Sequence, residues 1–579
     1  MSNLRFERPP AQASSAQLPR LWRWIVIVVL FLGIFFRVSY LERKVYWVDE
    51  VATSIRVAGY TRTEVIQQVS QGQVLSPQDL LQFQQLTPDR SIRQTWQALV
   101  KSPEHAPLYF LLTRLWAEGF GSSVVAMRSL SVLFSLLALP CLYGFVQELF
   151  KSPFIASIAV VLASVSPFFV AYAQEARPYS LWILTLILSG WLLLRGLRLG
   201  DRGSWFAYAI CLSLGFYTSL LSIFVAIAQG IYVFITGRLL KQYQMIPFRN
   251  WAIAAGLAGL SFTPWIIVIL QHWQKLQDNT TWMQSPMDLA AMIAIWLYSI
   301  VILFVDFPVY LAFDPVIVSA VLADIGLITL VGYSFYFLCR RTLLSRSFFV
   351  VTLTFSTLSF LIVLDLVLQT QTSTAPRYWM PAHLGILLAI AHLFGQKLSM
   401  SQVRLDHHLR LWKLGLIILI SMGVISCGVN LKRSPRFQKT RNLHNGAIAT
   451  LINQADNPMV LTESSQTLDL LSLSHDLVPQ ARIQILPSLR SLTDSSSCQS
   501  FFVFNPSETF TQTLKQQYSE QIRRIYQPKL LIPGEISLTL WQVDGNTGTC
   551  SPSRSSSTPN EESWKSELMI SPERKLPPS

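Results

Sequence analysis

The chain contains a series of long apolar runs, which constrain its fold more than any other feature. Each run is close to the roughly 20 residues that an α-helix needs to cross the hydrocarbon core of a bilayer. In that core, only helices and closed barrels satisfy their own backbone hydrogen bonds. The composition agrees, because 51% of the residues are hydrophobic and 13% are charged, whereas soluble domains carry about 25% charge. The sequence therefore predicts an α-helical polytopic membrane protein.

Eleven runs are predicted to cross the membrane when length is combined with the preference of Lys and Arg for the cytoplasmic side. Ser204–Ile235 would be about 48 Å long as one helix, so we divide it near residues 215–218 into two crossings. Residues 271–315 are predicted to add either no crossing or two, which gives about 11–13 helices. The eleven spans are Leu21–Tyr40, Val124–Phe150, Pro153–Tyr172, Pro178–Leu194, the two parts of Ser204–Ile235, Trp251–Gln271, Val316–Leu338, Phe348–Leu368, Tyr378–Leu393 and Leu411–Val429.

The distribution of charge predicts how the chain is oriented in the membrane. The net charge is +14, and the basic residues lie between apolar spans. This pattern favours cytoplasmic loops that contact anionic lipid, and it argues against nucleic acid as a partner. The N-terminal segment 1–20 is basic and is predicted to be cytoplasmic. An odd number of crossings then places the C-terminus outside. We expect a multi-pass protein of the cytoplasmic membrane.

The remaining polar stretches divide the chain into domains. Residues 21–430 are predicted to form the membrane domain, in which 41–123 is a large external loop with interfacial helices such as Leu108–Phe120. Residues 431–550 read as a small external α/β domain, and 551–579 as a disordered tail. A disulfide between Cys498 and Cys550 is an open alternative in this external location. The predicted elements of the α/β domain are strands at Met459–Thr462, Arg482–Leu486, Phe501–Phe504 and Ser537–Val543, and helices at Asn445–Asn453 and Thr509–Arg523.

Two adjacent acids, Asp49 and Glu50, follow the first span, Leu21–Tyr40. Carboxylates are costly in hydrocarbon, whereas the preceding Tyr46 and Trp47 suit the interfacial belt. The pair is therefore predicted to lie at the outer membrane surface and to face something there. A solvated acidic turn is the alternative interpretation.

The predicted topology collects further polar residues at the same outer face. Arg177 and Arg377 lie there against the positive-inside preference. An anionic partner such as a phosphate explains this placement, because guanidinium groups bind phosphate well; a local ion pair such as Glu175–Arg177 is the alternative. The set predicted at this face comprises His105, Arg128, Glu175, Arg177, Tyr179, Arg377 and Tyr378.

This combination of residue types predicts transfer of a sugar from a lipid phosphate. A carboxylate can take the proton of an acceptor hydroxyl, and guanidinium groups can hold a phosphate as it leaves. We assign Asp49 as the general base and Glu50 as an orienting residue. His105 is either a substrate-binding residue or an ordinary loop histidine.

The motifs in this region resemble those of the GT-C superfamily of integral-membrane glycosyltransferases, in particular the family-39-like group of protein-mannosyltransferase and aminoarabinose-transferase type. The resemblance covers roughly 21–430 and is strongest before Gly200. The motifs that carry it are Val48-Asp49-Glu50, His105-Ala106-Pro107-Leu108, Phe120-Gly121 followed by Arg128, and Tyr172-Ala173-Gln174-Glu175-Ala176-Arg177-Pro178-Tyr179.

The resemblance implies an inverting transfer from a polyprenyl-phosphate sugar to a lipid, glycan or protein acceptor at the outer leaflet. Asp49 matches the catalytic acid of the first external loop, and Glu175 matches the second external acid. Ala106 departs from the usual His-Pro-Pro-Leu pattern, which affects the local stiffness of that loop. The family varies in its use of metal, and no ligand cluster is present in the sequence, so no cofactor is predicted and a divalent metal ion stays an open alternative.

Two other classes of function compete with an enzyme. A lipid or sugar transporter would hold charges near the middle of the membrane and show a duplicated half. The spans contain Asp324, Asp365 and His383, but no clear repeat. A non-catalytic envelope assembly protein would use the external domain for binding. A transfer assay with purified protein separates the three.

Overall fold

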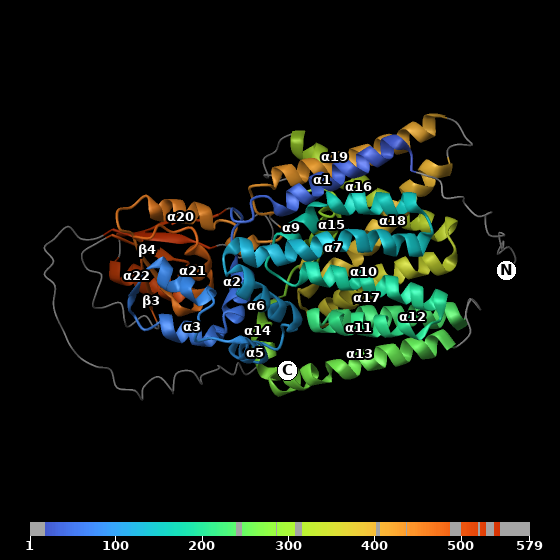
Figure 1. Cartoon of the computed structure of the whole chain (residues 1–579). Helices are drawn as coiled ribbons and strands as arrows, with labels where there is room; N and C mark the ends of the chain where they lie inside the picture. Colours follow the sequence, from blue (N-terminus) through green and yellow to red (C-terminus); the bar gives the residue numbers. More distant parts are fainter. Residues whose placement is uncertain are drawn as a thin grey trace, which may run out of the picture.

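The computed structural model describes residues 18–238, 246–284, 286–306, 315–400, 406–435, 437–486, 500–518, 521–528 and 538–544. Its helices form a bundle at one end, and a small sheet with its own helices lies at the other end (Figure 1). The predicted fold class, a helical membrane protein with a small C-terminal α/β unit, is confirmed. The tail 551–579, Cys498 and Cys550 lie outside the described residues, so the predicted disorder and the disulfide stay predictions.

Each of the eleven predicted spans corresponds to helical structure. Among the residues that the structure describes, eight helices are long and apolar enough to cross a membrane, and a bent pair of helices can count as a ninth span. The helix α15 is too short for that at about 1.5 Å per residue, which favours no added crossing in 271–315. The bundle consists of α1 (Arg20–Val38), α7 (Val124–Phe150), α8 (Pro153–Ser164), α9 (Pro167–Ala173), α10 (Tyr179–Leu199), α11 (Arg202–Thr218), α12 (Ser222–Arg238), α13 (Ile246–Gln271), α15 (Leu289–Val301), α16 (Pro315–Arg341), α17 (Leu344–Leu368), α18 (Met380–Met400) and α19 (Asp406–Val429).

The third predicted span, Pro153–Tyr172, is not one helix. It divides into α8 and α9, which meet at a 61° bend. Pro167 has no N–H and cannot continue a helix without a clash. Arg37 from α1 donates to the last carbonyl groups of α8, those of Ala163 (3.0 Å) and Ser164 (2.6 Å). These contacts satisfy groups that the break would leave without partners inside the bundle.

The loop 41–123, which the sequence predicts to be external, contains short helices, as predicted. Thr61, Ser76 and Ser91 each cap a helix through a capping box, which explains why such short polar segments are helical. The helix at Leu108–Phe120 has the bounds that the sequence predicts. The helices of this outer layer are α2 (Val48–Val57), α3 (Arg62–Val69), α4 (Pro77–Leu81), α5 (Ile92–Val100) and α6 (Leu108–Phe120), together with α14 (Trp273–Asn279) from a later loop.

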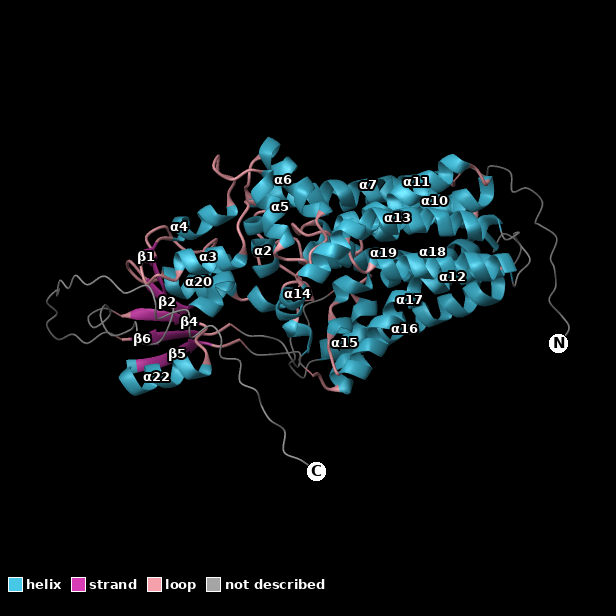
Figure 2. Ribbon diagram, turned by 90° about the horizontal axis from the view of Figure 1, so that it is seen from below, coloured by secondary structure: helices cyan, strands magenta, loops and turns pink. Residues whose placement is uncertain are grey.

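The C-terminal unit contains a six-stranded sheet of order β1-β3-β2-β4-β6-β5 (Figure 2). The strand β2 is parallel to β3 and β4, and the other pairs are antiparallel. The predicted helix Thr509–Arg523 is wrong at its end, because Ile522 and Arg523 belong to β5. The elements are α20 (Asn445–Asn453), β2 (Met459–Glu463), α21 (Thr467–Leu473), β3 (Arg482–Leu486), β4 (Phe501–Phe504), α22 (Glu508–Tyr518), β5 (Ile522–Tyr526) and β6 (Leu540–Val543).

One edge of this sheet comes from the membrane domain's own external loop. The strand β1 (Val74–Leu75) pairs antiparallel with β3, with Val74 opposite Gln484. The sequence did not predict this strand, because two residues give no alternating pattern. The sheet of the C-terminal unit is therefore completed by a strand from the loop 41–123.

Candidate active site

Asp49 lies in the first turn of α2, and its side chain is 27% exposed. The prediction that it follows the first span directly is wrong, because α1 ends at Val38 and α2 begins only at Val48. The intervening segment is held by hydrogen bonds from other parts of the chain. Gln174 donates to the carbonyl groups of Phe36 (2.7 Å) and Ser39 (2.8 Å) at the end of α1. The position of Asp49 is thus set by contacts across the bundle.

Arg128 on α7 holds the remainder of this segment. Its guanidinium donates to the carbonyl oxygens of Leu41, Lys44 and Val45 and to both carboxylate oxygens of Glu50. These bonds use all five N–H donors of an arginine. The side chain is completely buried. The prediction that Arg128 binds substrate is therefore wrong: its position in the first turns of α7 directs it behind the site, where it fixes the loop before α2.

Glu50 is also completely buried, and it joins three parts of the chain. It lies 2.7 Å from Arg128 and 2.7 Å from Lys439, which follows the last span. It also accepts a hydrogen bond from the backbone N–H of Ala176 (2.9 Å). Burial alone would raise the pKa of Glu50, but Arg128 and Lys439 lower it to about 2. Glu50 is an ionised positioning residue, which fits its predicted orienting role and excludes direct contact with a substrate.

Glu175, the second predicted catalytic acid, is also buried behind the site. Its carboxylate accepts hydrogen bonds from Trp47 Nε1 (3.0 Å) and from Gln438 Nε2. Burial and the nearby charge of Glu50 raise the pKa of Glu175 to about 7. Both carboxylate oxygens of Glu175 are hydrogen-bonded within the protein, and the side chain is 0% exposed. Glu175 therefore does not face the partly exposed site at which Asp49 lies. It positions Trp47, which directly precedes α2.

Four other predicted residues converge with Asp49. Arg177 Nη2 lies 3.9 Å from Asp49 Oδ2, and Arg177 stacks on the ring of Tyr179 at 5.8 Å. Arg377 lies over the rings of Trp47 (5.8 Å) and Tyr378 (5.3 Å). Burial alone would lower the pKa of Arg177, but Tyr179, Asp49 and Glu175 raise it above its ordinary value. One guanidinium group therefore pairs with the partly exposed carboxylate of Asp49, and a second lies over the ring of Trp47, two residues before it.

Arg177 has a hydrogen-bond donor that no described residue uses. Its Nη1 donates to the carbonyl of Asp49 (3.4 Å) and to Thr53 Oγ1 (3.3 Å). Its Nε is buried and has no hydrogen-bond partner within the described ranges. A buried donor of this kind costs about 1–3 kcal/mol if it stays unsatisfied. An anion bound at Arg177 would remove that cost.

His105 lies next to this set, as predicted, and contacts Glu104. Its Nε2 is 3.5 Å from Glu104 Oε1, and its ring packs against Phe110. Burial and the positive charges of Arg56 and Arg177 keep the pKa of His105 well below its usual value. It is therefore neutral near pH 7 and can donate or accept a hydrogen bond without adding charge.

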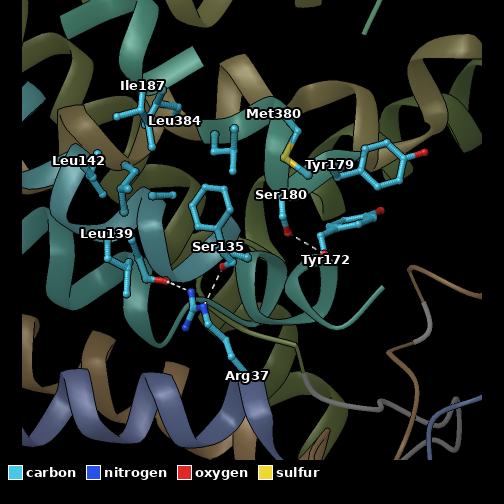
Figure 3. Close-up of a pocket in the computed structure, with 15 residues that line it drawn as sticks. Arg37, Ser135, Leu139, Leu142, Tyr172, Tyr179, Ser180, Ile187, Met380 and Leu384 are labelled. Atoms are coloured by element: carbon cyan, nitrogen blue, oxygen red, sulfur yellow. Dashed lines mark hydrogen bonds between the residues drawn. The ribbon is translucent and has the colours of Figure 1, made fainter. Parts of the chain in front are cut away.

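A small, mostly apolar cavity of about 30 Å³ lies inside the bundle (Figure 3). Tyr172 and Tyr179 line it at the side of the candidate site, and Arg37 and Ser135 form its polar floor, joined by a 2.9 Å hydrogen bond. The other lining residues are Ala138, Leu139, Leu142, Ala163, Phe169, Ser180, Ile183, Ile187, Met380, Leu384 and Leu387. This volume is far below the roughly 300–1,000 Å³ that is typical of ligand pockets, so the cavity as it stands has room for no more than a small group.

Sequence reasoning missed the residues that the C-terminal part contributes. Lys439 pairs with Glu50, Gln438 bonds Glu175, and Asn442 Oδ1 accepts from the backbone N–H of Val48 at 2.9 Å. These residues lie in a short polar segment after α19, and nothing in its composition distinguishes it from a linker. No three His, Cys, Asp or Glu side chains lie together as a metal site among the residues that the structure describes.

One family model matches part of the chain. The model of the family described as dolichyl-phosphate-mannose-protein mannosyltransferase matches residues 104–267. This match confirms, over those residues, the resemblance to family-39-like membrane glycosyltransferases. A search of curated protein sequences finds no match.

Several solved structures are similar over most of the chain. ArnT from Cupriavidus metallidurans bound to undecaprenyl phosphate is 12% identical, with 90% of this chain and 97% of that one covered and a TM-score of 0.46. The Archaeoglobus fulgidus oligosaccharyltransferase AglB, in complex with an inhibitory peptide and a dolichol-phosphate, is 11% identical, with 80% and 64% covered and a TM-score of 0.45. The mycobacterial arabinofuranosyltransferase AftD is 12% identical, with 92% and 40% covered and a TM-score of 0.46.

Proposed function

We propose that this protein is a membrane glycosyltransferase that moves a hexosyl or pentosyl group from a polyprenyl-phosphate donor to a lipid, glycan or protein acceptor. The reaction takes place at the outer face of the cytoplasmic membrane and inverts the anomeric centre. The observation that carries the proposal is the arrangement of Asp49 at 3.9 Å from Arg177, with Arg377 5.8 Å from the ring of Trp47, two residues before Asp49. The family match over residues 104–267 supports the same reaction class.

The proposed step is a single displacement. The acceptor hydroxyl oxygen attacks the anomeric carbon and gives its proton to Asp49. The bond between that carbon and the phosphate oxygen breaks, and the phosphate leaves with the electron pair. Arg177 and Arg377 stabilise the negative charge that develops on this phosphate. Phosphate is a good leaving group once it is held in this way, so the step requires no separate general acid.

In this proposal the donor's phosphate lies at Arg177, next to Asp49, and at Arg377, over the ring of Trp47. The neutral His105 would bond the sugar or the phosphate. The reaction is tested by incubating the purified protein with a radiolabelled polyprenyl-phosphate sugar: bond formation supports a transferase, and movement of label across a vesicle membrane without a new bond supports a transporter.

The proposed orientation places the C-terminal unit outside. The basic side chains Arg195, Arg198 and Arg202 flank α10 and α11 at the end of the bundle away from the sheet, which fits a cytoplasmic location. A topology reporter fused after Val543 is expected to be active only outside, and the same reporter inserted after Arg198 only in the cytoplasm. Activity of the Val543 fusion in the cytoplasm would refute the orientation and the external site.

Arg177→Ala is expected to weaken binding of the donor lipid. The substitution removes a charge-assisted contact, which is worth about 1.5–3 kcal/mol. The measurement is the Kd for undecaprenyl phosphate with the full chain in detergent. Arg198→Ala is the matched control, because the side chain of Arg198 is 47% exposed and, within the described part of the chain, pairs with Glu148 alone. If Arg177→Ala and Arg198→Ala bind undecaprenyl phosphate with equal Kd values, Arg177 only holds α2 in place and does not bind the donor.

A further inference from the structure

Asp365 is a buried acid in α17 that the proposed reaction does not use. Its side chain is 1% exposed, whereas Leu366, Val367 and Leu368 beside it are exposed, and the helix ends at Leu368. A negative charge in the last turn of a helix is unfavourable, because that end of the helix already carries partial negative charge. The helix itself therefore does not explain Asp365, and the reason has to lie in contacts with the segment that follows.

The carboxylate of Asp365 holds the segment after α17. One oxygen accepts hydrogen bonds from Thr370 Oγ1 (2.5 Å) and from the backbone N–H of Thr372 (2.9 Å), and the other accepts one from the backbone N–H of Ser373 (2.5 Å). Hydrogen bonds to an ionised acceptor are stronger than those between neutral groups. All three donors lie within the eight residues that follow Asp365, so one buried side chain fixes the path of this turn.

Ser373 links the turn to two neighbouring elements. Its Oγ accepts a hydrogen bond from Trp296 Nε1 on α15 (2.9 Å), and its carbonyl oxygen accepts one from Trp379 Nε1 (2.7 Å). Trp379 is buried and is the last residue of the short 3-10 helix Pro376–Trp379. Arg377 lies in the same helical turn, two residues before Trp379. The hydrogen bond between Trp379 and Ser373 therefore also fixes the backbone that carries Arg377.

We propose that Asp365 is a positioning residue for Arg377. The order that its carboxylate gives to residues 370–373 reaches Arg377 through Trp379 and keeps the guanidinium over the ring of Trp47, at 5.8 Å. This inference rests on the proposed function, in which Arg377 binds the donor's phosphate. Asp365 is buried, and both of its carboxylate oxygens accept hydrogen bonds within the protein, so it does not touch the donor. An acid in an apolar span is then explained without transport.

Asp365→Asn tests this role, because the amide keeps the size of the side chain but replaces one accepting oxygen by an NH₂ group. The first readout needs no donor. Phenylglyoxal modifies arginine side chains, and its reaction at Arg377 is followed by peptide mass spectrometry on the full chain in detergent. Arg377 is expected to react faster in Asp365→Asn than in the wild type. Asp324→Asn is the matched control and is expected to leave the rate unchanged, because the side chain of Asp324, on α16, makes no hydrogen bond or ion pair with any residue that the structure describes.

The second readout is the Kd for undecaprenyl phosphate in a double-mutant cycle. Asp365→Asn is expected to weaken binding about tenfold, as for a lost charge-assisted contact. In Arg377→Gln the same substitution is expected to have no further effect, because a positioning residue acts only through the group that it positions. A general loss of folded protein would instead lower binding in both backgrounds by the same factor.

The proposal is overturned if Arg377 reacts with phenylglyoxal at the same rate in Asp365→Asn and the wild type, or if the two substitutions have independent effects on the Kd. If the wild type does not bind undecaprenyl phosphate, the proposed function fails, and the modification rate of Arg377 still decides whether Asp365 positions it. Should Asp365→Asn not fold, Thr370→Val takes its place. That substitution removes one donor to the carboxylate and leaves the two backbone donors, and the same direction of change is expected in both readouts.

Discussion

Asp49→Asn is expected to slow single-turnover transfer at least a hundredfold while the protein stays folded and binds the donor lipid. The amide keeps the size and shape of the side chain but cannot take a proton. General base catalysis is typically worth about 10²–10⁴-fold in rate. Asp49 is 27% exposed, and its charged partner, Arg177, is 3.9 Å away, which is too far for a hydrogen bond, so the substitution breaks no direct hydrogen bond between the two side chains. The measurement is transfer from a saturating radiolabelled polyprenyl-phosphate sugar, with donor affinity determined in the same samples.

The matched control for Asp49→Asn is Thr53→Ser, one turn further along α2. It keeps a hydroxyl for Arg177 and does not change the charge at Asp49, and its turnover is expected to stay close to that of the wild type. Near-normal turnover in Asp49→Asn would show that another group takes the proton. Asp49 would then be a solvated acidic residue in the first turn of α2 without a catalytic role. The assignment of the protein as an enzyme would lose its main support.

The sequence predicted the layout of the membrane domain because apolar length is a direct physical requirement of the bilayer. Hence α6 and α7 have the predicted bounds. The bend between α8 and α9 was missed although Pro167 is visible in the sequence, because a proline inside an apolar run is compatible with a kinked helix or with a break. Arg37, whose hydrogen bonds stabilise the break, is far away in the chain.

The sequence predicted which residues form the candidate site, but it did not predict the role of each residue. Asp49, Glu50, Arg128 and Arg177 all lie close together, as the motifs suggested. A motif does not reveal which side chains are buried, and only the structure places Glu50 and Arg128 in contact at 2.7 Å. Lys439 was not predicted at all, because its contact with Glu50 spans 389 residues and involves a segment without a pattern.

Glu50→Gln is expected to lower the free energy of unfolding by about 3–5 kcal/mol, the cost of breaking a buried ion network by removing one partner. The substitution leaves Arg128 and Lys439, both 0% exposed, without their shared anion. Transfer activity is expected to fall together with the stability, because the segment that precedes α2 loses the contact with Arg128 and Lys439 that holds it in place. Glu42→Gln is the matched control: Glu42 lies in the same loop but is 59% exposed, and the change there is expected to stay within about 0.5 kcal/mol.

The pH dependence of stability separates this structural role from a catalytic one. The pKa of Glu50 falls from an ordinary value of 4.5 to about 2 in the folded protein, since the attraction of Arg128 and Lys439 outweighs the effect of burial. A carboxyl group with a lowered pKa contributes its full stability above its unfolded pKa and loses it as the pH falls toward the folded value. Wild-type stability should therefore decline between about pH 4.5 and 2, and Glu50→Gln should lack this component. If Glu50→Gln unfolds like Glu42→Gln yet transfers no sugar, Glu50 acts in the chemistry, and the assignment of Asp49 as the sole base is wrong.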